Sequence, residues 1–100
     1  EINRADDAIV QLKEAIKVMP NNLRVYYNLS LLYDKKGDFK NAEKVIIAGL
    51  KIDSNNEGLL YVLAYVYNKN NQKSKAKNIA AKLIELFPNN QQYRSFYDQL

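Results

Sequence analysis

The sequence of 100 residues repeats itself with a period of 34 residues. A spaced alanine and a pair of asparagines show the period most clearly: Ala8, Ala42 and Ala76, and the pairs that begin at Asn21, Asn55 and Asn89. Where identity is lost, apolar character is kept at the same phase. A fixed period of this length is typical of repeat proteins, in which one unit cannot bury its hydrophobic face alone. The period therefore predicts an array of stacked units in a single domain.

Within each period the apolar spacing is helical. Val25, Leu29 and Tyr33 share one helix face at i, i+4 and i+8, and the same pattern returns one period later. A second amphipathic segment follows in each period. The chain is therefore predicted to be all-α, with six helices. The residues at the core phase are expected to be buried: Ala8, Leu12, Leu29, Tyr33, Ala42, Leu63, Tyr67 and Ala76.

The connections between the helices carry residues that suit tight turns. Asn3, Gly37 and Asn71 fall at one phase between helices, and Gly and Asn tolerate the left-handed backbone that such a turn requires. Asp38 is expected to cap the helix that follows it. After each second helix a Pro or a Ser precedes the asparagine pair, one member of which is expected to cap the next helix. These features predict short connections and no linker.

This pattern resembles the tetratricopeptide repeat, whose consensus has an aromatic residue, Leu-Gly, Tyr, Ala, Phe, Ala and Pro. Residues 23–56 supply Tyr26, Leu29-Ser30, Tyr33, Ala42, Ile46, Gly49 and Ser54 at these places, and residues 57–90 supply Leu60, Leu63-Ala64, Tyr67, Ala76, Ala80, Leu83 and Pro88. Leu83 departs from the second Ala, and Ser54 departs from the Pro. The resemblance covers the whole chain and implies a right-handed superhelical solenoid of antiparallel helix pairs. Pentatricopeptide repeats, which have a period nearer 35 and bind RNA, are the family most easily confused with it.

The same resemblance divides the chain into two complete repeats and two partial ones. The expected units are the second helix of a truncated repeat at 1–22, full repeats at 23–56 and 57–90, and a further first helix or a C-terminal cap at 91–100. The chain is thus expected to be a fragment of a longer array. The helix side around Ala5, Ala8 and Leu12 would then lack its partner, which predicts fraying or homo-oligomer formation through the exposed repeat ends.

Composition excludes most catalytic classes. The chain has no Cys and no His, which removes thiolate nucleophiles, the usual zinc sites and the general base that titrates near neutral pH. The nearest pair of carboxylates, Asp6 and Asp7, suits the start of a helix. No enzyme activity, cofactor or metal is therefore expected. The apolar runs are too short for a membrane span and no signal-peptide pattern is present, so neither insertion nor export is expected, and the compartment stays open.

In the tetratricopeptide fold the first helices line a concave groove, and the resemblance implies which residues face it. The candidate peptide-binding residues are Arg24, Tyr27, Asn28, Leu31, Lys35, Tyr61, Val62, Tyr65, Lys69 and Phe96. Exposed tyrosine and aliphatic side chains at these places would offer rigid contact area to a peptide. The alternative is that the rings pack across the groove onto neighbouring repeats. Lys35 and Lys69 would form a basic rim that favours acidic segments.

The sequence therefore predicts a non-catalytic adaptor that binds a peptide or protein segment in its groove. The alternative is a structural spacer or a self-association element of a larger protein. Chaperone-binding members of the family hold a C-terminal carboxylate with Lys, Asn and Arg side chains. Asn28 keeps one of these places, but Gly58 and Val62 replace the Lys and Arg that follow, so this clamp is not expected. The net charge of +4 lies mostly on dispersed lysines, which does not favour nucleic acid as a partner.

Overall fold

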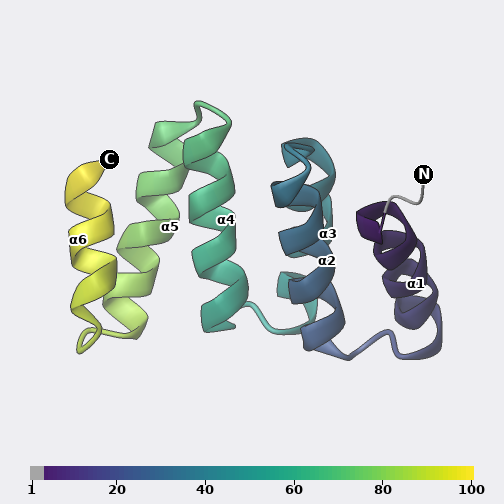
Figure 1. The fold of residues 1–100 in the computed structure, drawn as a ribbon. Coiled ribbons are helices and arrows are strands. Elements are labelled where there is room, and N and C mark those ends of the chain that lie inside the picture. The colour runs from purple at the N-terminus through teal and green to yellow at the C-terminus, as the bar shows by residue number, and fades with distance from the viewer. Residues whose placement is uncertain (1–3) are drawn as a thin grey trace.

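Six helices joined by short turns make up the computed structural model, which describes residues 4–100 (Figure 1). They are α1 (Arg4–Val18), α2 (Leu23–Lys35), α3 (Phe39–Ile52), α4 (Glu57–Lys69), α5 (Lys73–Leu86) and α6 (Gln91–Gln99). No strand occurs in the described part of the chain. The prediction of an all-α fold with six helices is confirmed.

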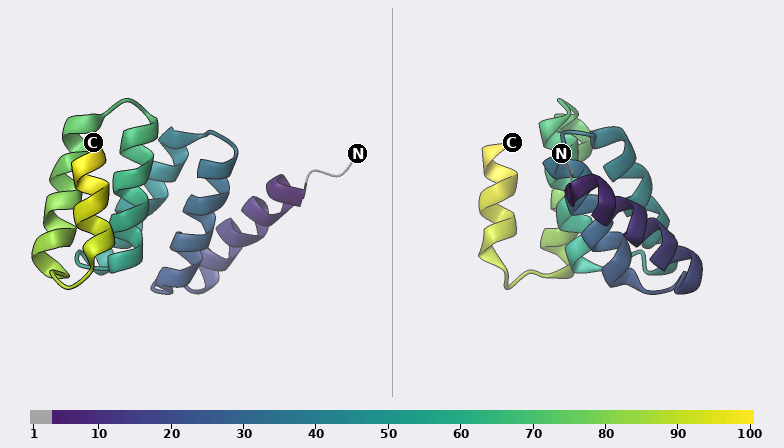
Figure 2. Two further views of the ribbon diagram at one scale, coloured as in Figure 1. Left: turned by 60° about the vertical axis from the view of Figure 1, so that its left-hand side comes forward. Right: turned by 45° about the vertical axis from the view of Figure 1, so that its right-hand side comes forward.

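The helices form an elongated array in which each helix runs antiparallel to the one before it (Figure 1). Each packs against its neighbour in the sequence, and α2 also contacts α4. The array measures 41 × 28 × 18 Å, with α1 at one end and α6 at the other (Figure 2). Because α2 and α4 touch directly, side chains of these two helices form one continuous surface.

Two of the turns adopt the backbone that the sequence predicts. Gly37 has φ = 78° and Asn71 has φ = 61°, both in the left-handed region. Asn3, the third residue at this phase, lies outside the described residues. Asp38 caps α3, because its side chain accepts a hydrogen bond from the backbone N–H of Asn41. The side-chain amide of Asn41 donates to the same carboxylate and lowers the pKa of Asp38 below its ordinary value.

The asparagine pairs cap three helices, as predicted. The side chain of Asn22 accepts from the N–H of Arg24 at 3.1 Å, and that of Asn90 accepts from the N–H of Gln92 at 3.0 Å. Asn56 accepts from the N–H of Leu59 at 3.0 Å. In each case the second asparagine of the pair satisfies a backbone donor that the first helical turn leaves without a partner.

The core agrees with the sequence at most of the predicted positions. Five of them are buried: Leu29, Tyr33, Ala42, Leu63 and Ala76. Three others, Ala8, Leu12 and Tyr67, are only half-buried, so the prediction is wrong for them. Ala8 and Leu12 belong to α1, which packs against α2 alone and buries Ile9 most deeply. Tyr67 lies near the end of α4, where the ammonium group of Lys75 covers its ring at 5.6 Å.

At Gly49, α3 lies close to side chains of α2 and α4. A Cβ atom at this position would lie 2.8 Å from Cδ1 of Leu59 and 3.2 Å from Cβ of Tyr26. A side chain larger than hydrogen would therefore have to displace a buried leucine. One period later the same place holds Leu83, which is fully buried between α4, α5 and α6. The two helix pairs therefore share a backbone plan but not the spacing at this contact.

Candidate binding groove

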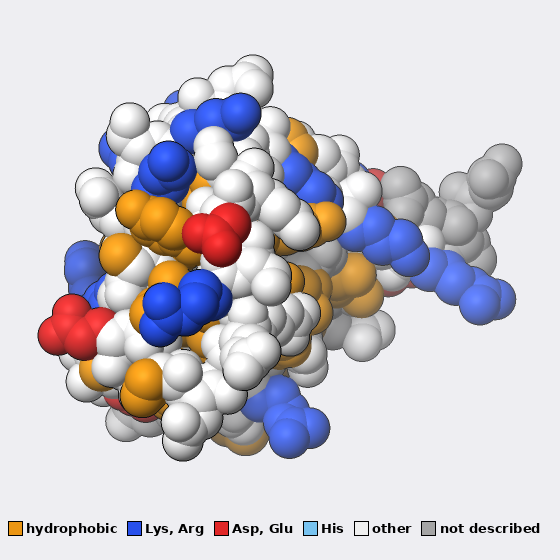
Figure 3. All heavy atoms as spheres, turned by 90° about the vertical axis from the view of Figure 1, so that its left-hand side faces the viewer, with side chains coloured by type: hydrophobic (Ala, Val, Ile, Leu, Met, Phe, Trp, Pro, Cys, Tyr) orange, Lys and Arg blue, Asp and Glu red, His pale blue; other side chains and the backbone are white. Residues whose placement is uncertain are grey.

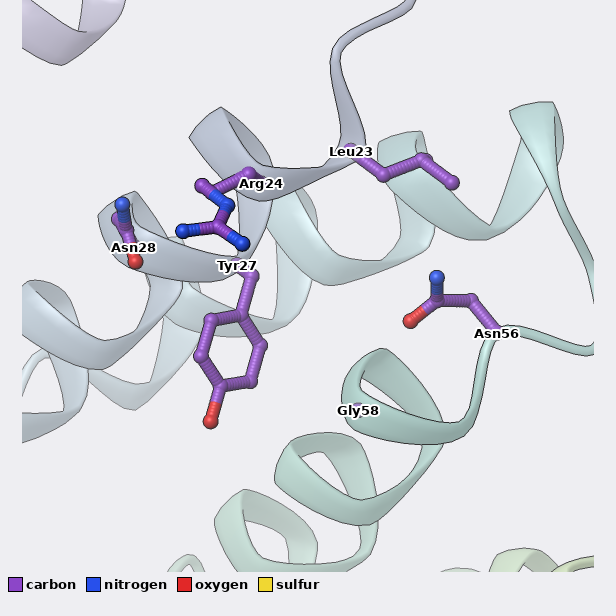
Figure 4. A pocket seen from close by; sticks show the side chains of 6 residues that line it. All are labelled: Leu23, Arg24, Tyr27, Asn28, Asn56 and Gly58. Carbon is purple, nitrogen blue, oxygen red and sulfur yellow. The ribbon is translucent and has the colours of Figure 1, made fainter.

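Two adjacent hollows lie between α2 and α4 and share the side chain of Tyr27. The first has a volume of about 450 Å³ and is lined by Leu23, Arg24, Tyr27, Asn28, Asn56 and Gly58 (Figure 4). The second has a volume of about 280 Å³ and is lined by Tyr27, Leu31, Asp34, Tyr61, Val62 and Tyr65. We call them the polar hollow and the apolar hollow. Together they form the groove between the first helices of the two complete periods.

The polar hollow is built by the first turns of α2 and α4. Arg24 and Asn28 are exposed on α2, and the amide of Asn56 faces them from the start of α4 (Figure 4). Gly58 makes room for the ring of Tyr27, because a Cβ atom at Gly58 would lie 3.3 Å from Cε1 of that ring. The absence of a side chain at Gly58 therefore lets the Tyr27 ring rest against α4.

The apolar hollow is surrounded by hydrophobic side chains that remain open to solvent. Tyr27 is 36% exposed, Leu31 is 38% exposed and Tyr65 is 40% exposed. All three line the same hollow, from α2 and α4. Exposed apolar side chains gathered in a concave place are typical of interaction sites, whereas single ones are ordinary on any surface.

Tyr61 is packed differently from the other groove tyrosines. Its ring centroid lies 5.6 Å from that of Tyr93 and 5.7 Å from that of Phe96, both on α6, and 6.5 Å from that of Tyr65. Tyr61 and Phe96 are half-buried. The sequence left open the alternative that the rings pack across the groove onto the next repeat. This alternative describes Tyr61 and Phe96.

A partly buried hydrogen bond supports this aromatic cluster. The hydroxyl of Tyr93 donates to Oε2 of Glu57 at 2.6 Å, joining α6 to the start of α4. Burial raises the pKa of the Tyr93 hydroxyl above its ordinary value, and the bond to Glu57 raises it further. The position of α6 is thus fixed by a polar contact as well as by ring packing.

One of the predicted site residues, Val62, is buried rather than exposed. The sequence places it off the core stripe, but it is 5% exposed and packs within the main hydrophobic core. The direct contact of α2 with α4 covers this part of α4, which is why α4 buries side chains on nearly all sides. Val62 forms the floor of the apolar hollow rather than an exposed contact.

The basic rim predicted from the sequence is also only partly present. Nζ of Lys69 lies 3.2 Å from Oδ2 of Asp34 and 4.4 Å from the centre of the Tyr65 ring. Lys69 is therefore not a free cation, because its charge is paired across the groove. Lys35 and Arg24 are exposed and form no ion pair with any of residues 4–100. Arg24 is the one of these two cations that lines a hollow.

On the face that Figure 3 shows, the basic side chains do not form a continuous patch. On the face that α5 and α6 present, they lie apart from one another among hydrophobic and polar atoms (Figure 3). Lys77 covers the ring of Tyr97 at 5.5 Å, and Lys82 donates to the backbone carbonyl of Ser54 at 3.2 Å. No cluster of three acidic side chains that could hold a metal occurs within residues 4–100. None of the helices that the structure describes has the length and hydrophobicity to cross a membrane.

Three residues of the polar hollow, Leu23, Asn56 and Gly58, are absent from the predicted site. The sequence identifies asparagines at this phase as helix caps, and the cap of α4 does use the Asn56 side-chain oxygen. Gly58 could have indicated this hollow from the sequence. It falls at a groove-facing place in its repeat and leaves space where other repeats carry a side chain.

Comparison with known proteins defines the class. The model of the tetratricopeptide repeat (TPR) family matches residues 3–57 and residues 37–100, so the chain belongs to this family. The fold is that of a protein–protein interaction module. A thermophilic TPR protein of Thermus thermophilus matches 95% of this chain and 48% of its own with a TM-score of 0.86 and 23% identity, which shows the shared fold. This chain thus spans about half the length of that protein. No curated protein matches the chain.

Proposed function

We propose that this chain is a non-catalytic adaptor that binds an extended protein segment in the groove between α2 and α4. The observation that carries the proposal is the gathering of three exposed hydrophobic side chains, Tyr27, Leu31 and Tyr65, around one hollow. Tyrosine combines a large apolar surface with a polar tip and loses little conformational entropy when it is bound. Such residues commonly contribute most of the affinity of a protein interface.

The geometry of the groove supports an ordered rather than an adaptable surface. Gly58 supports the Tyr27 ring from α4, and the ammonium group of Lys69 lies over the Tyr65 ring. Val62 closes the floor between them. Side chains that are already held in place lose less freedom when a partner binds, which favours affinity.

A selection experiment tests the proposal. A library of displayed random peptides is selected on this chain, and the recovered peptides are measured against Leu31→Ala and Tyr65→Ala variants. We expect each substitution to weaken binding by about 1 to 3 kcal/mol, the range for central contacts of an interface. Ile47→Ala is the matched control, because Ile47 is also 38% exposed but lies on α3 and lines neither hollow. Peptides that respond to Ile47→Ala and not to the groove variants would contradict the proposal.

Self-association is the second candidate function, and α1 favours it. Val10 is 60% exposed and Val18 is 79% exposed on this helix, and neither lines the polar hollow or the apolar hollow. If α1 forms a contact between copies, sedimentation velocity should show mass that increases with concentration. A Val10→Glu, Val18→Glu double variant should then remain monomeric. A native chain that is monomeric at every concentration would exclude this candidate.

A further inference from the structure

We infer that the groove recognises an acidic side chain and an apolar side chain of one extended segment, the carboxylate at Arg24 and the apolar group in the apolar hollow. This inference rests on the proposed function and makes it more specific. It assigns a separate role to each of the two hollows. The partner is thus defined by its chemistry, as a segment in which a Glu or Asp stands at a fixed distance from a Leu or an aromatic residue.

The charges around the groove define which end receives the carboxylate. At the far end of the apolar hollow, Lys69 and Asp34 neutralise each other, and the Asp34 carboxylate is largely buried in that pair. At the polar hollow, Arg24 faces the groove with no carboxylate of residues 4–100 in ion-pair contact. The acidic residue at the start of α4, Glu57, instead accepts a hydrogen bond from the hydroxyl of Tyr93. Arg24 is therefore the cation of the groove that can pair with the carboxylate of a bound segment.

The polar groups beside Arg24 are suited to an acceptor. The amide groups of Asn28 and Asn56 line the same hollow (Figure 4). The oxygen of Asn56 is already used by the N–H of Leu59, which leaves its N–H₂ group as a donor. A guanidinium group binds a carboxylate through two parallel hydrogen bonds, and such charge-assisted bonds are stronger than neutral ones. The polar hollow thus offers donors to a ligand that has only acceptors.

The distance between the two hollows sets the spacing in the partner. Arg24 and Leu31 are seven residues apart on α2, a rise of about 10 Å along the helix. An extended chain in the polyproline II conformation has three residues per turn, so it covers roughly 9 Å in three residues and carries both side chains on the same side. The segment that fits therefore carries its acidic and apolar residues three positions apart.

The source of the carboxylate is a side chain rather than a chain terminus. Among the described residues, the polar hollow is lined only by the first turns of α2 and α4. No other element of the described chain closes it beyond Arg24. A bound main chain can therefore continue past the start of α2, and an internal Glu or Asp satisfies the site.

Four peptides with blocked ends and a fifth with a free end test the inference on the isotope-labelled chain by chemical-shift titration. The first is Gly-Ser-Glu-Ser-Ser-Leu-Ser-Gly, acetylated and amidated, and the second replaces its Glu by Gln. The third separates Glu from Leu by six residues, and the fourth reverses the order of the first. The fifth lacks Glu and ends in a free carboxylate three residues from Leu. Of the first and the fourth peptide, the one that binds more tightly is used in all comparisons, together with a matched peptide in which Gln replaces Glu.

We expect the Glu peptide to bind about fivefold more tightly than its Gln counterpart, the effect of one partly exposed charge-assisted contact. In an Arg24→Gln variant this preference should fall below about twofold, and Leu31→Ala should weaken both peptides alike. Lys35→Gln is the matched control, because Lys35 is an exposed cation on the same helix that lines neither hollow. It should leave the preference unchanged. The spectra of the variants show at the same time that each is folded.

Three results would overturn the inference. They are equal binding of the Glu and Gln peptides, a preference that persists in Arg24→Gln, and equal binding of the peptide with the longer spacing. Tighter binding of the free-carboxylate peptide would instead assign the polar hollow to a chain terminus, which also overturns it. If the peptides shift the resonances of Leu31 and Tyr65 without any dependence on Arg24, the proposed groove stands and only this inference fails.

Discussion

Tyr27 and Tyr61 occupy the same place in successive periods, but their surroundings differ. Tyr27 faces Gly58 and keeps about a third of its surface open, at 36% exposed. Tyr61 meets two aromatic rings from α6 and is half-buried. The difference arises from the next helix in the array, which offers a glycine to one tyrosine and aromatic side chains to the other. The place of a residue within its repeat therefore does not by itself define whether the side chain serves binding or packing. The residues of the next helix must also be known.

The two helix pairs also differ at their closest contacts. In the pair α2–α3 the close contact is made by Gly49, which leaves no space for a Cβ atom. In the pair α4–α5 the same place is filled by Leu83, which is fully buried. The first pair is thus held by close backbone approach, and the second by a large apolar side chain. Four experiments test these differences.

The largest effect is expected from Leu83→Ala. The side chain is 0% exposed, and its removal leaves a cavity between α5 and its neighbours. We expect a loss of about 2 to 5 kcal/mol in the free energy of unfolding, measured by chemical denaturation. Leu86→Ala, on the same helix but 36% exposed, is the matched control and should cost less than about 1 kcal/mol. Equal losses would show that α4 and α5 are not held together by Leu83.

Alanine substitutions of the two groove tyrosines test the first comparison directly. Tyr61→Ala removes three ring contacts, so we expect a loss of about 2 kcal/mol in stability. Tyr27→Ala should cost less than about 1 kcal/mol, because the ring is partly exposed and its main neighbour is a glycine. Thermal and chemical unfolding measure both. If Tyr27→Ala is the more damaging of the two, the assignment of Tyr27 to binding and Tyr61 to packing must be exchanged.

Alkaline pH should weaken the region around α6 through Tyr93. Its pKa is raised above 10.0 in the folded chain by burial and by the bond to Glu57, so the folded state keeps a proton that the unfolded state releases. Stability from this group is complete below pH 10 and decreases as the pH rises above it. Burial raises the pKa of Tyr67 in the same direction. A Tyr93→Phe variant should lose less stability than the native chain between pH 9 and 11, and an identical decline would contradict this role.

The smallest effect is expected from the ion pair across the groove. Lys69→Gln removes a half-exposed pair, so we expect a loss of about 0.5 kcal/mol at low salt and less at high salt. Lys35→Gln should leave stability unchanged, because Lys35 has no such partner among the described residues. Denaturation curves at two salt concentrations separate the cases. A loss for Lys69→Gln that does not depend on salt would show that its contact with the Tyr65 ring is the larger contribution.

The features that the sequence predicts well are local ones. The left-handed backbone at Gly37 and Asn71 and the caps at Asn22, Asn56 and Asn90 depend on a few consecutive residues. The 34-residue period aligns these signals in successive units, so the helices and their order follow. Burial of Ala42 and Ala76 follows in the same way, because both lie at one phase of the repeat.

The features that the sequence predicts poorly depend on how one repeat meets the next. The burial of Val62 results from the contact of α2 with α4, and the pairing of Lys69 with Asp34 joins side chains of successive repeats. The packing of Tyr61 depends on two rings of α6. These three features depend on how neighbouring repeats are rotated relative to each other. The spacing of residues within a single repeat does not reveal that rotation.

Within residues 4–100, the backbones approach closely only between helices that follow one another in the sequence and between α2 and α4, while α4 and α6 are joined by side chains. In a fold of this kind most contacts join residues that are close in the sequence, which favours fast folding. It also lets one end open while the rest stays intact, because each helix depends on its immediate neighbours. Amide hydrogen exchange should therefore be graded along the chain. We expect it to be fastest in α1, which among the described helices packs against α2 alone, and slowest in α4, which is surrounded by α2, α3, α5 and side chains of α6.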